Sequence, residues 1–136
     1  MVTGGLAEKM TPLLDRDFGP DVYEIEKGMV RRFLEAIEDD SPRWETETPP
    51  TFPCALPPRT LLHQILNVDL PLTRVLNGSS ELEYRRPIHV GDSIAVTGRL
   101  VRVKETAGRL FLLTEITWTK QTGEAAVTGK NTYIRY

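Results

Sequence analysis

The sequence predicts a single α+β domain in which a curved antiparallel β-sheet wraps around a central apolar helix. Apolar residues recur at spacings of three and four before residue 71, as in helices, and at a spacing of two after residue 79, as in strands. Five prolines between residues 49 and 58 separate the two regions. A chain of 136 residues is long enough to form one core without disulfides or a structural metal.

The N-terminal part of the chain predicts a loose start followed by a helix. Residues 1–20 show little periodicity and end in Phe-Gly-Pro, which indicates a flexible segment and a turn, so we expect the single domain to span residues 21–136. A helix is expected over residues 26–38, because apolar side chains recur there on one side. The predicted core-facing side comprises Ile25, Met29, Val30, Phe33, Leu34 and Ile37. A Ser-Pro pair at residues 41–42 then ends the helix.

The proline-rich stretch predicts a rigid connector, and an apolar helix follows it. Each proline lacks a backbone N–H and fixes φ, so residues 48–53 cannot form a helix interior or a central strand. Beyond them, residues 59–67 show helical spacing and are mostly apolar. A helix of this composition is expected to be enclosed by other elements.

The C-terminal half predicts an antiparallel meander. Apolar residues alternate with polar ones, and Gly-containing turns at 107–108 and 122–123 separate the runs. The expected strands lie near residues 81–84, 93–105, 109–121 and 125–135. Strands of this length suit one strongly curved sheet. Such a sheet leaves exposed edges, which favours pairing with a second copy or a relative, so we expect a dimer.

Composition argues against several classes of function. Seventeen basic and nineteen acidic residues give a net charge of −2 without a basic face, so we expect no nucleic-acid partner. Cys54 has no cysteine to pair with and no apolar run approaches the ~18 residues of a membrane span, which favours a soluble cytoplasmic protein. Neither histidine has a second ligand at metal-binding spacing, and no phosphate-binding loop is present, so no metal or cofactor is expected.

Three stretches of the chain form a set that is similar to a known family. They are residues 33–42 (FLEAIEDDSP), 49–53 (PPTFP) and 83–92 (EYRRPIHVGD). On these residues the chain resembles the MaoC-like dehydratases of the hotdog superfamily, and in particular their N-terminal, degenerate half-domain, called the FAS1-like dehydratase domain. The resemblance extends from about residue 22 to residue 136 and implies a hotdog fold.

The resemblance also implies an incomplete catalytic site. Catalytic members of the family add water to, or remove it from, an acyl thioester with the Asp and His of a Gly-Asp-x-Asn-Pro-x-His motif. The motif falls on Glu38, Asp39, Ser41, Pro42 and Trp44, so that only the Asp and the Pro match. An indole nitrogen is a donor only and cannot exchange a proton near neutral pH, as a histidine does. Asp39 is thus the one candidate catalytic residue, or else a solvated loop charge.

The candidate substrate-binding residues come from three parts of the chain. They are Trp44, Phe52, Leu62, His63, Leu66, Arg85 and Arg86. The two aromatic residues would line an acyl tunnel or pack in the core, and the three helix residues would contact the acyl chain or belong to the core or an interface. The two arginines would meet the phosphates of coenzyme A, because guanidinium groups pair bidentately with phosphate, or lie in solvent. His89 is expected to be an exposed loop residue.

The resemblance implies an acyl-thioester-binding subunit of an (R)-specific enoyl-CoA/ACP hydratase or 3-hydroxyacyl-thioester dehydratase. Its ligand would be an acyl-CoA or acyl-carrier-protein thioester, and it would form a homodimer or a heterodimer with a catalytic hotdog subunit. Two alternatives stay open, a hotdog acyl-CoA thioesterase and a non-catalytic binding module. The helix over 59–67 contains no Asp or Glu, which disfavours the thioesterase because its general base must reach the attacking water.

Overall fold

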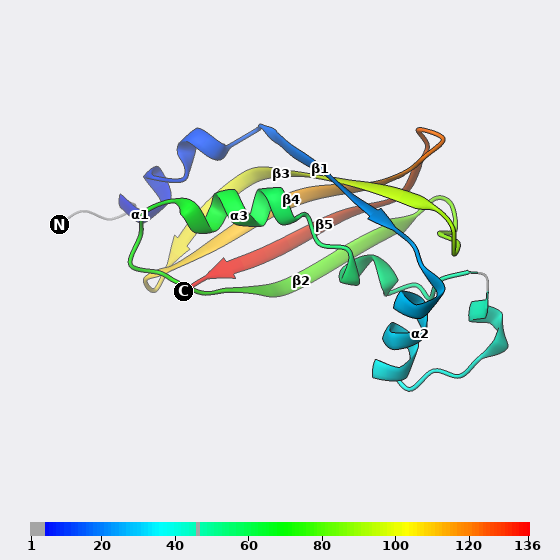
Figure 1. Ribbon diagram of the computed structural model, residues 1–136. Coiled ribbons are helices and arrows are strands. Elements are labelled where there is room, and N and C mark those ends of the chain that lie inside the picture. Colours follow the sequence, from blue (N-terminus) through cyan, green and yellow to red (C-terminus); the bar gives the residue numbers. More distant parts are fainter. Residues whose placement is uncertain (1–4, 46) are drawn as a thin grey trace.

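The computed structural model describes residues 5–45 and 47–136 and shows a five-stranded antiparallel sheet in the order β1-β3-β4-β5-β2 (Figure 1). The strands are β1 (Asp17–Glu24), β2 (Val75–Tyr84), β3 (Ser93–Thr106), β4 (Arg109–Lys120) and β5 (Ala125–Arg135). The helices are α1 (Gly5–Glu8), α2 (Lys27–Ala36) and α3 (Arg59–Asn67), with short 3-10 helices η1 (Thr11–Leu13), η2 (Pro42–Glu45) and η3 (Phe52–Ala55). No helix within these residues has the length and apolar character needed to cross a membrane.

Helix α3 lies along one face of the curved sheet, which confirms the predicted hotdog arrangement (Figure 1). Leu61 and Ile65 on its inner side are fully buried. The helix approaches β3 closely at Gly98, where a Cβ atom would lie 2.7 Å from Leu61 Cδ2. The core therefore needs glycine at this position, and a larger residue would push the helix away from the sheet.

Alternation along β3, β4 and β5 matches the prediction, because one face of each strand is buried against α3 and the other is more exposed. The bounds of these strands agree with the expected ones to within one residue. Strand β2 begins at Val75, before the expected position, and most of its residues are exposed because it is an edge strand with few apolar side chains.

The N-terminal segment differs from the prediction. Instead of a loose start over residues 1–20, the structure places α1, η1 and half of β1 within residues 5–20, and residues 1–4 lie outside the described residues. Met10 and Leu13 are buried in the core. The boundary predicted at residue 20 therefore falls inside a strand of the sheet.

Strand β1 was missed because it contains Pro20. The strand pairs with β3, and its register shifts between Phe18 and Asp21, where the proline cannot donate a ladder hydrogen bond. A proline is tolerated here because β1 is an edge strand with an irregular register. The Phe-Gly-Pro sequence therefore lies in a strand and not in the predicted turn.

Helix α2 occupies most of its predicted range but packs differently. It lies beyond the end of the sheet (Figure 1), and Phe33 contacts Phe52 of η3 edge-to-face at 5.3 Å between ring centres. Val30 is buried, whereas Ile37 is 44% exposed. The predicted core-facing side of this helix is therefore buried only in part, because the sheet does not extend beneath it.

Arg135 at the end of β5 holds the C-terminal end of α3. Its buried guanidinium donates hydrogen bonds of 2.7 Å to the carbonyl of Ile65, 2.8 Å to that of Val68 and 2.6 Å to that of Leu72. The last carbonyls of a helix have no partner within it, so a cation here satisfies them. Arg135 therefore fixes the helix against the sheet.

Candidate functional site

The loop after α2 brings Asp39 and Trp44 into direct contact. The indole Nε1 of Trp44 donates a hydrogen bond of 2.8 Å to Asp39 Oδ2, and the backbone amide of Ser41 donates one of 3.0 Å to Oδ1. The turn is set by Glu38, whose φ of 56° places it in the left-handed region. Both carboxylate oxygens of Asp39 therefore accept hydrogen bonds from groups that do not release a proton near neutral pH.

A cavity of about 470 Å³ lies between α2 and this loop. Its lining residues are Lys27, Val30, Arg31, Leu34, Asp39, Asp40, Ser41, Pro42, Trp44 and Val90. Cations from α2 thus face acidic residues of the loop, and the lining contains no histidine among the residues that the structure describes. The cavity offers charge but no group whose ordinary pKa is close to 7.

A second cavity, of about 290 Å³, lies beside the first and shares Trp44 with it. We call it the arginine groove; it is lined by Arg43, Trp44, Glu47, Thr48, Pro49, Pro50, Pro53, Tyr84, Arg85, Arg86, Pro87, Ile88 and Val127. Its apolar lining includes buried prolines, Ile88 and Val127. Its exposed cationic residues make it suitable for an elongated ligand with apolar and anionic parts.

The arginines of this groove are held only weakly. Arg85 pairs with Glu83 at 3.5 Å and Arg86 with Glu124 at 3.1 Å, and all four side chains are more than half exposed. Arg43 lies over the ring of Trp44 at 4.9 Å. Exposed ion pairs contribute little to stability, so a phosphate group could replace the carboxylates as a partner of these arginines.

The arginine groove has two walls, residues 43–53 and residues 84–88, which are joined by hydrogen bonds. The amide and the hydroxyl of Thr48 donate hydrogen bonds of 2.9 and 3.0 Å to the carbonyl of Ile88. Glu47 and His89 form an isolated antiparallel bridge, and the hydroxyl of Tyr84 donates to the carbonyl of Pro50. The predicted connector is therefore extended at its start, but it turns at Thr51 into the 3-10 helix η3, whose first turn tolerates a proline.

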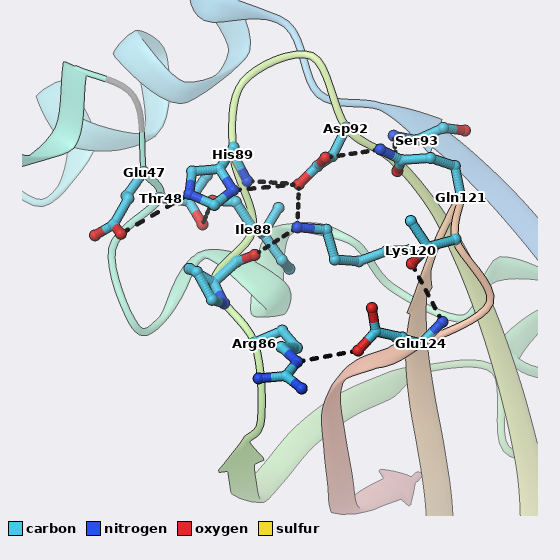
Figure 2. A network of polar contacts seen from close by, with 12 residues as sticks. Glu47, Thr48, Arg86, Ile88, His89, Asp92, Ser93, Lys120, Gln121 and Glu124 are labelled. Carbon is cyan, nitrogen blue, oxygen red and sulfur yellow. Dashed lines mark hydrogen bonds and ion pairs between the residues drawn. The ribbon is translucent and has the colours of Figure 1, made fainter.

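Asp92 is the centre of a polar network with His89, Gln121 and Lys120 (Figure 2). Its carboxylate accepts hydrogen bonds of 2.8 Å from the His89 amide and 2.9 Å from Gln121 Nε2, and lies 3.0 Å from Lys120 Nζ. Burial acts to raise the pKa of Asp92, but the donors from Gln121, His89 and Lys120 outweigh it and lower the pKa below its ordinary value. Asp92 is therefore ionised at neutral pH.

The structure divides the predicted substrate-binding residues into separate groups. Trp44, Arg85 and Arg86 line the arginine groove. Phe52 is fully buried beside Phe33 and belongs to the core.

The remaining three predicted residues lie on α3 and line neither of these two cavities. Leu62 is half-buried and Leu66 is 42% exposed. His63 is exposed, so it is not a core group, and of the predicted alternatives a residue of an interface or of the substrate site is left.

Other residues of the site were not predicted. His89 is half-buried and bridges the groove walls instead of being an exposed loop residue. Tyr84 lies inside one of the stretches that carry the family resemblance, and Arg43 directly follows another, so the sequence contained a signal for both as site residues. Lys120 had none, because it comes from the far end of another strand. Among the described residues, no three His, Cys, Asp or Glu side chains gather as a metal site.

The arrangement of the sheet and α3 defines a hotdog fold. The structure matches one chain of the HadBC complex of Mycobacterium tuberculosis, a 3R-hydroxyacyl-ACP dehydratase. The TM-score is 0.75 and the identity 18%, over 90% of this chain and 96% of that one. It also matches a MaoC-like dehydratase with a TM-score of 0.76 and 21% identity over 93% of this chain and 43% of that one.

The sequence comparisons assign the family. The family described as FAS1-like, dehydratase domain region matches residues 14–129, and the chain therefore belongs to it. The chain is 29% identical to a UPF0336 protein of Saccharopolyspora erythraea, over 89% of this chain and 87% of that protein. It is 28% identical to a UPF0336 protein of Thermobifida fusca, over 80% of this chain and 81% of that protein.

Proposed function

We propose that this chain is the acyl-thioester-binding subunit of an (R)-specific enoyl-CoA/ACP hydratase or 3-hydroxyacyl-thioester dehydratase, and that a partner hotdog subunit supplies the catalytic Asp and His. The observation that carries the proposal is the hydrogen bond from Trp44 Nε1 to Asp39 Oδ2. It occupies the carboxylate at the position where catalytic relatives carry their Asp, with an indole at the position of their His.

The chemistry of hydration explains why this contact matters. Addition of water to an enoyl thioester requires a base that removes a proton from water and an acid that protonates the neighbouring carbon. The indole of Trp44 cannot accept a proton, and both oxygens of Asp39 already have donors. We therefore expect this half of the assembly to bind the substrate without performing the proton transfers.

The edge of β2 provides a surface for the partner. Strand β2 is a long edge strand on which Leu76 and Tyr84 are 42% and 49% exposed. The other edge strand, β1, is interrupted at Pro20 and offers a poorer template. An unpaired edge accepts a strand from another chain. Similar structures include two complexes, HadBC and ChsH1-ChsH2, which supports a hotdog partner.

The two groups of candidate residues would contact different parts of one ligand. The arginine groove, with Trp44, Arg85 and Arg86, suits the phosphate-bearing end of a thioester. Leu62, His63 and Leu66 stand on the half-exposed side of α3, which would line the acyl tunnel once a partner covers it. Phe52 would support this wall from the core.

A hydration assay on crotonyl-CoA and a longer trans-2-enoyl-CoA tests the proposal. The purified chain is expected to show no turnover alone, and turnover on the order of 1–1000 s⁻¹ when a catalytic hotdog subunit is added. Turnover at such rates by the chain alone would contradict the proposed division of labour. Release of free thiol from acyl-CoA would instead identify a thioesterase.

Binding has to be measured separately from turnover. Calorimetric titration of the chain with crotonyl-CoA is expected to show binding that weakens in the Arg85→Gln/Arg86→Gln variant. Tight binding without turnover in the presence of any catalytic partner would favour a pure binding module, which the bond between Trp44 and Asp39 also permits.

A further inference from the structure

His89 follows Ile88 of the arginine groove and forms a backbone bridge to Glu47, and its imidazole stands between two carboxylates (Figure 2). Nε2 is 3.8 Å from Glu47 Oε1 on one wall, and Nδ1 is 3.8 Å from Asp92 Oδ2 next to the other. Both distances exceed the length of about 2.9 Å of a formed N–H···O hydrogen bond. A neutral imidazole has one N–H and can donate to one carboxylate, whereas an imidazolium can donate to both.

The two carboxylates differ in how firmly they are held. Asp92 is nearly buried and is fixed by Gln121 and by Lys120, whose ammonium group also donates a 3.0 Å hydrogen bond to the carbonyl of Pro87. Glu47 has 36% of its side chain exposed and belongs to the wall that carries Thr48 and Trp44. An attraction between His89 and Glu47 would therefore move the wall that contains Glu47, because Asp92 stays fixed.

The charges of the cluster change when His89 gains a proton. Glu47 and Asp92 are negative and Lys120 is positive, so the four groups together carry one negative charge when the imidazole is neutral and none when it is protonated. The Asp92 carboxylate interacts with both Lys120 and the imidazolium. Glu47 is therefore the second carboxylate to which the imidazolium can donate. Because His89 and Glu47 are partly exposed, water screens the added attraction and the effect is moderate.

We propose that His89 is a positioning residue of the arginine groove, whose protonated form joins Glu47 to Asp92 and draws the two walls together. When the proton is lost, the wall with Glu47, Thr48 and Trp44 loses this side-chain contact and becomes looser. It is then held by the hydrogen bonds of Thr48 to Ile88, by the backbone bridge between Glu47 and His89 and by Tyr84. The ligand affinity of the groove then depends on whether His89 carries a proton. This consequence rests on the proposed function for the identity of the ligand, whereas the proton-dependent contact does not.

Nuclear magnetic resonance of the two indole N–H groups tests the contact without any ligand. Trp44 reports on the mobile wall, and Trp118, which donates a 3.0 Å hydrogen bond to the buried carbonyl of Leu56, is an internal reference. Between about pH 8 and pH 5, where histidine side chains titrate, the Trp44 resonance is expected to move and the Trp118 resonance to stay. The His89→Gln variant keeps an N–H donor but cannot take up a proton, and should abolish the movement.

Two further variants sharpen this test. Glu47→Gln removes the mobile carboxylate and should reduce the movement, whereas His63→Gln removes the exposed histidine of α3 and should leave the titration curve unchanged. A Trp44 resonance that moves in His89→Gln as it does in the native chain would overturn the proposal, because another group, such as the Asp39 carboxylate bonded to Trp44, would then be its cause.

Coenzyme A binding separates this inference from the proposed function. The native chain is expected to bind coenzyme A roughly threefold more tightly at about pH 6 than at about pH 7.5, beyond any change seen in His89→Gln, which accounts for titration of the phosphate itself. Equal pH dependence in the two proteins would contradict the inference. Absence of coenzyme A binding at every pH, with the Trp44 titration intact, would contradict the proposed ligand and leave the contact established.

Discussion

Asp39 and Asp92 are both carboxylates whose two oxygens accept hydrogen bonds, but their partners differ. Asp39 is held by the Trp44 indole and a backbone amide, neither of which carries a charge. Asp92 faces Lys120, which carries a positive charge, and His89, which can carry one. Asp39, the predicted catalytic residue, is therefore bound by uncharged donors, whereas the charged groups gather around Asp92.

The largest expected effect comes from Asp92→Asn. The substitution would leave Lys120 nearly buried beside an amide and turn an N–H group toward the donor of Gln121. We expect a loss of about 2–3 kcal/mol in the free energy of unfolding, measured by urea denaturation. The matched change Asp39→Asn gives up one of two hydrogen bonds from uncharged donors and should lose about 1 kcal/mol. Equal losses of unfolding free energy in the two variants would mean that the two carboxylates contribute equally to stability, which would contradict this comparison.

The pH dependence of the Asp92 effect sharpens the comparison. Because the folded-state pKa of Asp92 lies below its ordinary value, the ionised carboxylate stabilises the fold above about pH 4. That stabilisation is lost as the pH falls through the lowered folded-state pKa. In a His89→Gln background, the loss of unfolding free energy caused by Asp92→Asn should be constant from about pH 7 to pH 5 and shrink toward about pH 3. A loss that grows on acidification would contradict this account.

Removal of the indole donor by Trp44→Phe should have a smaller effect. The ring keeps its contact surface, but Asp39 Oδ2 loses its 2.8 Å hydrogen bond and gains access to water. We expect a loss of about 1 kcal/mol in the free energy of unfolding. Chain-alone hydration of crotonyl-CoA should stay absent in this variant, because no proton-accepting partner replaces the indole. Turnover by Trp44→Phe alone would show that Asp39 suffices as a catalyst.

The smallest effect is expected for His89→Gln. The imidazole lies 3.8 Å from both carboxylates, beyond hydrogen-bonding distance, so its removal at about pH 8 should change the free energy of unfolding by less than about 0.5 kcal/mol. His63→Gln on the exposed side of α3 is the control at the same pH. A loss above about 1 kcal/mol in His89→Gln alone would mean that the residue holds the groove walls together despite these distances.

Local patterns in the sequence determined most of the architecture. The alternation over residues 93–135 and the helical spacing over 59–67 depend on which side of each element is buried, and that side is visible in a single stretch of chain. The stretches around Asp39 and Arg85 likewise carried the family resemblance. These features could be predicted because each depends on neighbouring residues.

Only the tertiary structure decided the features that depend on distant residues. Strand β1 forms despite Pro20 because β3 offers it a partner, and α2 leaves part of its apolar side exposed because the sheet ends before it. Lys120 and Gln121 meet Asp92 because the end of β4 lies beside the start of β3. The sequence named Asp39 and Trp44 as a mismatched pair, but it took the fold of the loop to turn the indole onto the carboxylate, since a hydrogen bond requires an orientation that spacing alone does not specify.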